Sequence, residues 1–482
     1  MHKKFNKIEL LKILPHDDIL QQCIHCGLCL ATCPTYDLTK MERSSPRGRI
    51  FLIKSVARGE MELSETFADE MNFCLDCQAC ETACPAGVLY GRMVETARVV
   101  VDEAGYGSRI GITVKRFALR KVVASRNGLK FVSRLLRLYQ KIGLQKLIRA
   151  TGVLKIFSKN LAEIETLAPV IADKFSDTQI NEIEMPKGEV KYKTAFHFGC
   201  LMNTMFADIN MDTIDVLKEC GCKIITPKDQ VCCGSLSGHN GDMDFALKQA
   251  RKNIDAFEKH EYDFLISNSA GCGAFMKDYA HLLEDDPAYA EKAKSFSSKV
   301  KDVMEFFAEQ KPDLTFQTVI SKSAATDSTC LPDRQAEKPS NMNLKQISPS
   351  GRNDNQETHE IDLELKNVTY HDACHLIHAQ KISVQPREVI KSLPGIKYTE
   401  LEEASWCCGS AGIYNVVRYE DSVVQLERKM KNIKNTEAKI VLTGNPGCMG
   451  QIKHGTKKFN VDVEVLHPVT LIKRLLLTDR NH

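Results

Sequence analysis

Apolar positions follow a helical period near the start of the chain and a strand-like pattern further along. Ile50, Leu52, Ile53 and Val56 recur at about the spacing of a helical turn, which predicts a helical N-terminal region. Short apolar runs that end in cysteine are typical of buried strands: TAFHFGC at 194–200, YDFLISNSAGC at 262–272 and AKIVLTGNPGC at 438–448. Amphipathic segments such as DMDFALKQARKNIDAFEKH at 242–260 lie between them and predict helices.

Cysteine motifs repeat together with this second pattern. FHFGC, VCCGS and NSAGC, which end at 200, 235 and 272, return as YHDAC, WCCGS and NPGC, which end at 374, 410 and 448. The intervals between the cysteines of the two sets differ by only one position, and such a match indicates a duplicated domain. Each copy is expected to be a βαβαβα unit, and we name the copies CCG domains after their shared motif.

Two other cysteine phrases repeat near the N-terminus. CIHCGLCLATCP at 23–34 and CLDCQACETACP at 74–85 both follow C-x2-C-x2-C-x3-C-P. In this motif three close thiolates hold one [4Fe-4S] cluster, and the cysteine before proline ligates the other cluster. The predicted ligands are therefore Cys23, Cys26, Cys29 and Cys84 for one cluster, and Cys74, Cys77, Cys80 and Cys33 for the second.

The alternative for these phrases is a pair of structural zinc sites, which also use CxxC pairs. Zinc requires neither the third cysteine of each phrase nor the Cys-Pro that ends it, so iron-sulfur clusters are favoured. The segment between the phrases is predicted to be helical, which makes the module similar to α-helical ferredoxin domains. Two clusters that share ligands lie close together and favour a path for electrons.

The CCG cysteines form two further candidate sites. In open α/β sheets, residues at the carboxyl ends of parallel strands converge in one crevice, and a glycine after the cysteine pair lets backbone approach a cluster closely. The alternative is inert buried cysteine in an α/β core. The candidate ligands are Cys200, Cys232, Cys233 and Cys272 in the first copy, and Cys374, Cys407, Cys408 and Cys448 in the second.

The expected fold class is therefore α+β multidomain, with an N-terminal α-helical ferredoxin domain followed by two duplicated α/β (βαβαβα) CCG domains. The expected boundaries are 1–105 for the ferredoxin domain, 106–190 for a basic helical linker region, 191–315 for the first CCG domain, 316–366 for a disordered insertion and 367–482 for the second CCG domain. The insertion is polar and turn-rich, without an aromatic residue between Phe316 and Tyr370. Cys330 lies within it and is not expected to be a ligand. Cys220 and Cys222 have no counterparts in the second copy, and core or spare thiols fit them best.

The linker region carries an unusual run of charge. Between Glu103 and Glu163 there are fourteen lysines and arginines and no acidic residue. Lys130, Arg134, Arg137 and Lys141 share one helical face, with apolar residues largely opposite. This is the pattern of an amphipathic helix at an anionic membrane surface. The alternative is a helix packed on its own protein with a solvated basic face.

Composition excludes several classes of protein. The 482 residues include 19 cysteines, are 43% hydrophobic and carry a formal net charge of +3. A chain of this size does not need disulfides to replace a core, and its first residues lack a signal-peptide pattern, so a reducing cytoplasm is expected. No apolar run approaches the roughly 20 residues of a membrane span. The charge and motifs give no support for nucleic-acid binding. No G-x-G-x-x-G fingerprint follows a strand, which places any flavin on another chain.

The chain resembles the glycolate oxidase iron-sulfur subunit family over nearly its whole length. The resemblance rests on CIHCGLCLATCPTY, PRGRIFLIK, CLDCQACETACPAGV, SAGCGAF, ACHLIHAQKI and CCGSAGIYN. Related families include lactate-utilisation, anaerobic glycerol-3-phosphate dehydrogenase and heterodisulfide reductase iron-sulfur proteins. The resemblance implies a partner subunit that carries FAD and oxidises glycolate, D-lactate or another 2-hydroxy acid, while this subunit passes electrons toward membrane quinone. It also implies a cytoplasmic protein, peripheral on the inner face of the cell membrane, with no catalytic residue of its own.

One departure from the family pattern concerns the CCG cysteines. The fullest pattern ends in CxxC, but Ser269 and Asn445 stand where its first cysteine would be, which argues against a non-cubane cluster. An ordinary [4Fe-4S] cluster in each domain, or a docking scaffold, stays open. His371 and His375 are candidate ligands or proton-coupled groups near quinone, or ordinary strand-end histidines. Arg43, Arg47 and Arg49 either offset cluster charge, dock a partner or are solvated turn residues.

Three functions are compatible with the sequence. The first is an electron-transfer subunit of a glycolate or D-lactate dehydrogenase. The second is a heterodisulfide-reductase-like catalytic subunit acting at a CCG cluster. The third is a scaffold without redox activity that binds zinc in place of iron.

Overall fold

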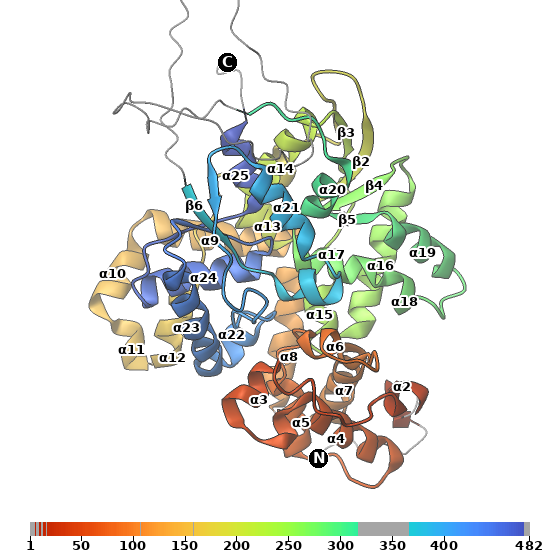
Figure 1. The fold of residues 1–482 in the computed structure, drawn as a ribbon. Helices are drawn as coiled ribbons and strands as arrows, with labels where there is room; N and C mark the ends of the chain where they lie inside the picture. The colour runs from red at the N-terminus through yellow and green to blue at the C-terminus, as the bar shows by residue number, and fades with distance from the viewer. Residues whose placement is uncertain are drawn as a thin grey trace, which may run out of the picture.

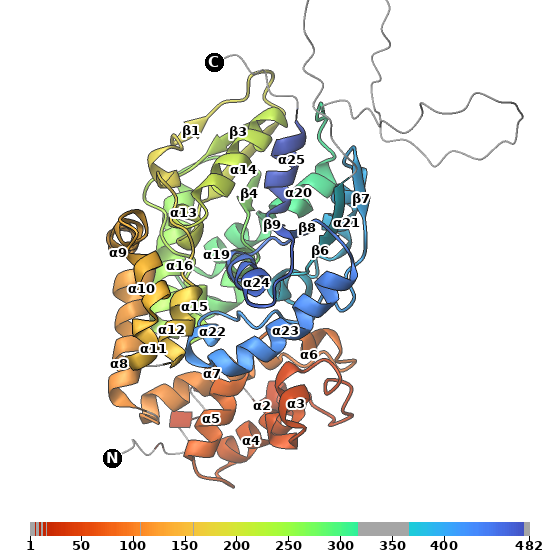
Figure 2. The ribbon, with the colours of Figure 1, turned by 90° about the vertical axis from the view of Figure 1, so that its left-hand side faces the viewer.

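A computed structural model of the chain describes residues 5, 9–10, 13–15, 17–106, 108–157, 159–316 and 366–476. A helical module occupies one end of the molecule and two α/β domains lie beyond it, with the linker helices along one side (Figures 1 and 2). The fold class expected from the sequence is confirmed. The expected insertion and Cys330 fall outside the described residues.

The N-terminal module is entirely helical in its described part. The helix expected around residues 50–56 is present, and it begins after Ser45, whose side chain accepts a hydrogen bond from Gly48 N and so caps the first turn. Ser64 caps the following helix in the same way. The elements are α2 (Asp17–Gln21), α3 (Pro34–Thr39), η1 (Glu42–Ser44), α4 (Pro46–Arg58), α5 (Glu65–Phe73), α6 (Ala79–Thr82) and α7 (Tyr90–Ala104).

The linker region forms a stack of helices against the first CCG domain. Its central helix begins at a serine N-cap, Ser125, which accepts from Gly128 N. The elements are α8 (Arg109–Phe117), η2 (Ala118–Val123, a π-helical turn), α9 (Arg126–Lys141), α10 (Leu144–Thr151), α11 (Val153–Phe157) and α12 (Lys159–Thr166). No described helix is long and apolar enough to span a membrane.

The orientation of α9 is the reverse of the alternative in which the helix packs on its own protein through its apolar side. Its basic side chains face the protein: Lys130 pairs with Asp177 at 2.5 Å, and Arg137 and Lys141 pair with Asp173. Lys130 and Arg134 also lie over the ring of Phe175. The apolar side is the one exposed to solvent, at Phe131, Val132, Leu135, Leu138 and Ile142. The alternative with an entirely solvated basic face is therefore wrong, although Arg134 and Lys141 stay exposed.

The first CCG domain is built on a five-stranded sheet of order β1-β3-β2-β4-β5. Only β1 runs antiparallel to its neighbour, and the other strands are parallel. The strands are β1 (Ile183–Glu184), β2 (Tyr192–His197), β3 (Cys222–Ile225), β4 (Phe264–Ser267) and β5 (Val300–Asp302). The helices are η3 (Ser176–Thr178), α13 (Leu201–Thr204), α14 (Ala207–Glu219), α15 (Ser235–Gly238), α16 (Met243–Glu258), α17 (Ala270–Lys277), α18 (Tyr279–Leu282), α19 (Ala290–Ser298) and α20 (Val303–Gln310).

The second CCG domain is built on a four-stranded parallel sheet of order β7-β6-β8-β9. Its strands are β6 (Lys366–Tyr370), β7 (Ile396–Tyr398), β8 (Ile440–Leu442) and β9 (Glu464–Leu466). Its helices are η4 (His375–Ala379, a π-helical turn), α21 (Val384–Ser392), α22 (Tyr414–Val417), α23 (Tyr419–Asn435), α24 (Pro446–Lys458) and α25 (Pro468–Leu475).

The two sheets have equivalent topologies, since β3-β2-β4-β5 corresponds strand by strand to β7-β6-β8-β9. Each copy contains four parallel strands where the sequence predicted three. The additional strands, β5 and β9, are only three residues long, and each leads directly into a terminal helix. The duplication is thus visible in the fold as well as in the cysteine spacing.

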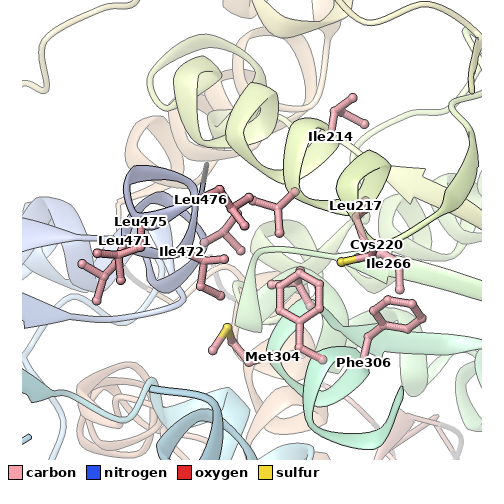
Figure 3. Close-up of a cluster of buried hydrophobic side chains, with 14 of the residues drawn as sticks. Ile214, Leu217, Cys220, Ile266, Met304, Phe306, Leu471, Ile472, Leu475 and Leu476 are labelled. Atoms are coloured by element: carbon pink, nitrogen blue, oxygen red, sulfur yellow. The ribbon is translucent and has the colours of Figure 1, made fainter. Parts of the chain in front are cut away.

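The two CCG domains share one hydrophobic core. The helix α25 of the second domain packs on α14 of the first, and α20 of the first packs on α21 of the second. These two contacts are equivalent under the duplication, because α14 and α21 each follow the first strand of their copy while α20 and α25 each follow the last. The shared cluster includes Ile214, Leu217, Met304, Phe306, Ile472 and Leu475 (Figure 3).

Candidate iron-sulfur centres

The first ferredoxin site is formed by the loop that precedes α3 and by the residue after α6. Cys23, Cys26, Cys29 and Cys84 line one small cavity, which Cys80 also borders. Cys26 is exposed, so this site lies near the molecular surface. Burial raises the pKa of the Cys29 thiol to about 11. The site thus contains the four thiols of the first predicted cluster.

The second ferredoxin site is more deeply buried. Cys33, Cys74, Cys77 and Cys80 line a neighbouring cavity. The Tyr90 hydroxyl donates to Cys74 Sγ at 3.4 Å, and Thr35 Oγ1 lies 3.3 Å from Cys33 Sγ. Burial raises the pKa of the Cys77 and Cys80 thiols well above their ordinary value. The cysteine before each proline therefore lies beside the three cysteines of the other phrase.

The loops at the two sites have the same backbone conformation. His25 and Gly27 in the first phrase have φ values of 56° and 86°, and Asp76 and Gln78, at the same positions in the second, have φ values of 53° and 59°. Such left-handed residues are costly outside glycine, so their repetition indicates one loop shape that both phrases must adopt.

Arg49 differs from the solvated alternative considered for it. It is fully buried, its Nε donates to Glu70 O at 2.7 Å and its Nη1 donates to Thr35 Oγ1 at 3.0 Å. It also lines the cavity of the second ferredoxin site. A buried cation at this place offsets the negative charge of thiolate ligands. Arg47 borders the first cavity and donates to His25 O at 3.2 Å, whereas Arg43 is largely exposed.

The cysteines of the first CCG domain converge at the carboxyl ends of its strands. Cys200 follows β2, Cys232 and Cys233 follow β3, and Cys272 lies in α17 after β4. The Cys200 and Cys232 sulfurs are 3.7 Å apart. Hydrogen bonds from Cys200 and Cys233 lower the pKa of the Cys232 thiol well below its ordinary value. The four predicted positions thus form one site.

The second CCG domain repeats this arrangement. Cys374 follows β6, Cys407 and Cys408 follow β7, and Cys448 lies in α24 after β8. Hydrogen bonds from Cys407 and Cys448 lower the pKa of the Cys408 thiol. Lys429 of α23 is fully buried nearby, and burial lowers its pKa to about 8 while the thiols of this site raise it.

The glycine of each CCG motif is required by its backbone conformation and by a neighbouring helix. Gly234 and Gly409 have φ values of 93° and 87°, a region that favours glycine. A Cβ on Gly409 would lie 2.4 Å from Ser422 O of α23, and one on Gly234 would lie 3.1 Å from Ala246 O of α16. A side chain at either position would therefore clash with the following helix, and the expectation that the glycine lets backbone approach a cluster stays a prediction.

The two CCG sites open into a single cavity of about 140 Å³ at the boundary between the domains. All eight CCG cysteines line it, together with Cys77 of the second ferredoxin site. Ser269 and Asn445, which replace the missing cysteines, also face it, and Gly271 N donates to Asn445 Oδ1 at 3.2 Å across the domain boundary. Cys220 and Cys222 lie instead in the shared hydrophobic core.

A polar junction that the sequence did not indicate joins the ferredoxin module to this cavity. His375 Nε2 donates to Asp76 O at 3.0 Å, and its ring lies 4.9 Å from that of His239. His239 Nδ1 lies 2.5 Å from Glu95 Oε1 and 3.4 Å from Asp76 Oδ2. Burial lowers the pKa of His239, but Glu95 and Asp76 outweigh it and raise the pKa to about 10. Arg98 Nη1 donates to the His239 carbonyl at 2.7 Å. No local sequence motif marks these contacts, because they join residues more than a hundred positions apart.

The donor chemistry at all four sites suits iron-sulfur clusters. Every cysteine in the described part of the chain is a free thiol, and each site gathers four of them, all buried or half-buried apart from the exposed Cys26. Thiolates are the usual ligands of such clusters. The arrangement thus defines a class of protein, in which a two-cluster ferredoxin module is joined to paired cysteine-rich domains.

Comparison with known families agrees with this class. Residues 19–88 match a 4Fe-4S dicluster domain, and residues 194–277 and 368–453 match the cysteine-rich CCG domain. Residues 113–168 match the linker region of the glycolate oxidase iron-sulfur subunit.

Relatives extend the match over most of the chain. A probable glycolate oxidase iron-sulfur subunit of Bacillus subtilis is 36% identical over 91% of this chain and 89% of its own. The glycolate oxidase iron-sulfur subunit of Escherichia coli is 28% identical over 91% of this chain and 90% of its own. Lactate utilization protein A of Bacillus licheniformis is 24% identical over 57% of this chain and 96% of its own. The chain belongs to the family of glycolate oxidase iron-sulfur subunits and is an iron-sulfur electron-transfer protein.

Proposed function

We propose that this chain carries electrons from the FAD of a partner subunit, which oxidises glycolate or D-lactate, toward membrane quinone. The single observation that carries the proposal is the unbroken series of four cysteine sites from the exposed loop at Cys26 to the cavity between the CCG domains. Iron-sulfur clusters, when bound, accept and pass on single electrons. The chain's own residues hold the sites in order and keep water from the inner ones.

We assign the ligands as the sequence predicted them. The first ferredoxin cluster takes Cys23, Cys26, Cys29 and Cys84, and the second takes Cys74, Cys77, Cys80 and Cys33. In each CCG domain the four converging cysteines are the candidate ligands. The proposed domain boundaries are those given by the sequence, with the end of α7 at Ala104 compatible with the first of them and with β1 of the linker region adding an antiparallel strand to the first CCG sheet.

The contact between the ferredoxin module and the second CCG domain supports direct transfer between them. Phe73 and Leu75 pack with Cys407 and Tyr414 in one small buried cluster, against which Cys77 and Cys374 also lie. Arg428 pairs with Asp37 at 2.8 Å across the same boundary. Such packing fixes the separation of the two sites and excludes solvent between them.

Access to quinone requires contact with a membrane, and we propose a cytoplasmic location with peripheral attachment to the inner face. The basic face of α9 is only partly free for this contact, since Lys130, Arg137 and Lys141 pair with Asp173 and Asp177. The exposed apolar side chains of α9 are the better candidate surface, because burying them in lipid or in a membrane-bound partner gains free energy.

The test of the proposal is the Cys408→Ala variant, purified anaerobically with its flavoprotein partner. Removing this ligand should lower the iron content by about one cluster and slow quinone reduction. Reduction of the partner's flavin by the 2-hydroxy acid should continue, since that chemistry takes place on another chain. Iron analysis, flavin absorbance and quinone reduction are measured on the same preparation.

The matched control is Cys220→Ala, which removes an equally buried thiol from the hydrophobic core, away from every site. It should leave iron content and quinone reduction near those of the unmodified protein. If Cys408→Ala also leaves both unchanged, the second CCG domain is a docking scaffold and the proposal fails for that domain. The heterodisulfide-reductase-like alternative predicts disulfide reduction by the isolated subunit, and the proposal predicts none.

A further inference from the structure

We infer that His371 is a nitrogen ligand of the metal centre in the second CCG domain, so that the two CCG centres differ in their ligands. The inference rests on the proposed function in requiring a cluster at this site, and it goes further by assigning a ligand other than cysteine. The residue follows β6 directly and precedes Cys374 by three positions. His197 occupies the same position before Cys200 in the first domain.

The first observation is that His371 has no polar partner of the ordinary kind. Its side chain is fully buried, no hydrogen bond of ordinary geometry reaches either ring nitrogen, and the polar group that it meets is the Cys408 thiol. Leaving a buried imidazole unpaired costs free energy, so a group in this state calls for an explanation such as a ligand or ion. His197 differs, because its Nε2 donates to Val231 O at 3.1 Å.

The second observation is where the ring lies. One ring nitrogen of His371 and the sulfurs of Cys408 and Cys448 all lie within 4.8 Å of one another. In the described part of the chain no comparable group of three surrounds His197. Imidazole is an established iron ligand and replaces cysteine at one iron of some iron-sulfur centres.

The third observation concerns Asn445, which stands where a further cysteine would complete CxxC. Its side chain is already engaged, since Oδ1 accepts from Gly271 N and Nδ2 donates to Cys448 Sγ at 3.6 Å. Asn445 therefore holds Cys448 in place and does not itself act as a metal ligand. The ligand that a cysteine at position 445 would have supplied must come from another residue. His371 is the buried, unpaired donor at that site.

The charged groups near the two CCG centres also differ, as their ligands do. Gly234 meets Ala246 of α16 in the first domain, and Gly409 meets Ser422 of α23 in the second, so these two helix positions are equivalent. Seven residues further along each helix lie Asn253 and Lys429, which are therefore equivalent as well. Asn253 is neutral, whereas Lys429 places a buried amino group near Cys408. A neutral nitrogen ligand and a nearby cation both favour the reduced form of a cluster. The second CCG centre should therefore have the higher reduction potential and receive electrons from its neighbours.

The experiment is pulsed electron paramagnetic resonance on the reduced, anaerobically purified full-length protein with ¹⁵N-labelled histidine. Direct coordination should give a strong ¹⁵N hyperfine coupling at the signal that Cys408→Ala removes. His371→Ala should abolish the coupling. His371→Cys should abolish it as well while keeping iron at the level of the unmodified protein, because the new thiol can take the same place. The matched control, His197→Ala, should keep the coupling.

The outcomes separate the inference from the function on which it rests. If Cys408→Ala lowers iron but the ¹⁵N coupling is absent or survives in both His371 variants, the ligand assignment is overturned and the proposed function stands. If Cys408→Ala leaves iron unchanged, the second CCG domain holds no cluster and both are overturned. Should His371→Ala fail to fold, the His371→Cys variant decides on its own, since persistence of the coupling in it refutes the assignment.

Discussion

Replacing His467 by asparagine tests how the two CCG domains are held together. His467 lies at the start of α25, where its Nδ1 accepts from Val469 N at 3.2 Å and its Nε2 donates to Asn268 O of the first domain at 3.0 Å. The bond from Val469 N requires the neutral ring, because a protonated Nδ1 cannot accept, whereas Nε2 can donate in either state. Burial lowers the pKa of His467 from 6.5 to about 4.

The sign and size of the effect follow from this shift. Between pH 6.5 and 4 the unfolded chain binds a proton at this histidine and the folded chain does not, so stability is lost as the pH falls through that window. The full loss is about 3 kcal/mol, and about 1.2 kcal/mol of it falls between pH 7.0 and 5.5. With a urea slope of about 3 kcal/mol per molar, this part moves the unfolding midpoint by about 0.4 M.

The assay compares urea unfolding of the unmodified protein and His467→Asn at pH 7.0 and 5.5 under anaerobic conditions. Asparagine can still cap α25 but does not titrate, so the variant's midpoint should fall by about 0.4 M less than that of the unmodified protein. The other titratable groups are present in both proteins, so their contributions cancel when the two midpoint shifts are subtracted. His260→Asn, at a partly exposed position, should behave like the unmodified protein. Equal midpoint shifts with and without His467 would refute the reasoning.

Three further outcomes are expected. Cys84→Ser should damage the first ferredoxin cluster rather than the cluster of its sequence neighbours, and loss confined to the second cluster's spectrum would contradict the crossed ligands. Gly409→Ala should destabilise the protein by roughly 2–5 kcal/mol in urea unfolding, because a left-handed residue is strained and its Cβ meets a helix carbonyl at 2.4 Å. Gly59→Ala, also at positive φ but with open space around it, should cost only about 1–2 kcal/mol, and equal losses would show that the contact is unimportant. Arg49→Met should cost about 2–4 kcal/mol, because it removes the buried hydrogen bonds of Arg49 to Glu70 and Thr35 while Arg43 still pairs with Glu70 at 3.0 Å. It should also lower the potential of the second ferredoxin cluster in a redox titration, and an unchanged potential would rule out the charge argument.

The ferredoxin module and the duplication could be predicted from the sequence because cluster ligands must recur at fixed intervals along the chain. A loop that wraps a cluster needs thiols at fixed short intervals, which is why the phrases at 23–34 and 74–85 match position by position. The CCG cysteines are further apart, but each follows an apolar strand, and parallel strands bring their carboxyl ends to one edge. The strands β5 and β9 were not predicted because they are three residues long and no cysteine motif follows them, whereas the equally short β8 leads into Cys448.

The orientation of α9 shows what periodicity leaves open. An amphipathic pattern defines two faces, but it does not say which face the rest of the chain covers. Asp173, Phe175 and Asp177 decide this, and they lie more than thirty residues beyond the helix. Arg49 was equally hard to assign, because in the sequence it is one of three arginines around a proline. Its partner Glu70 is recognised only once α4 and α5 are packed together.

The reciprocal packing of α14 with α25 and of α20 with α21 has a consequence for how the two sites can evolve. A chain with a single such domain could make these contacts only with a second copy of itself, and every substitution would then appear twice, once at each site. Joining the copies in one chain removes that constraint and keeps them at a high effective concentration. A residue can then change in one domain alone: Asn253 of the first domain is neutral, and Lys429 at the equivalent position of the second is charged. The fused pair is therefore free to hold two centres of different potential, which two identical subunits could not do.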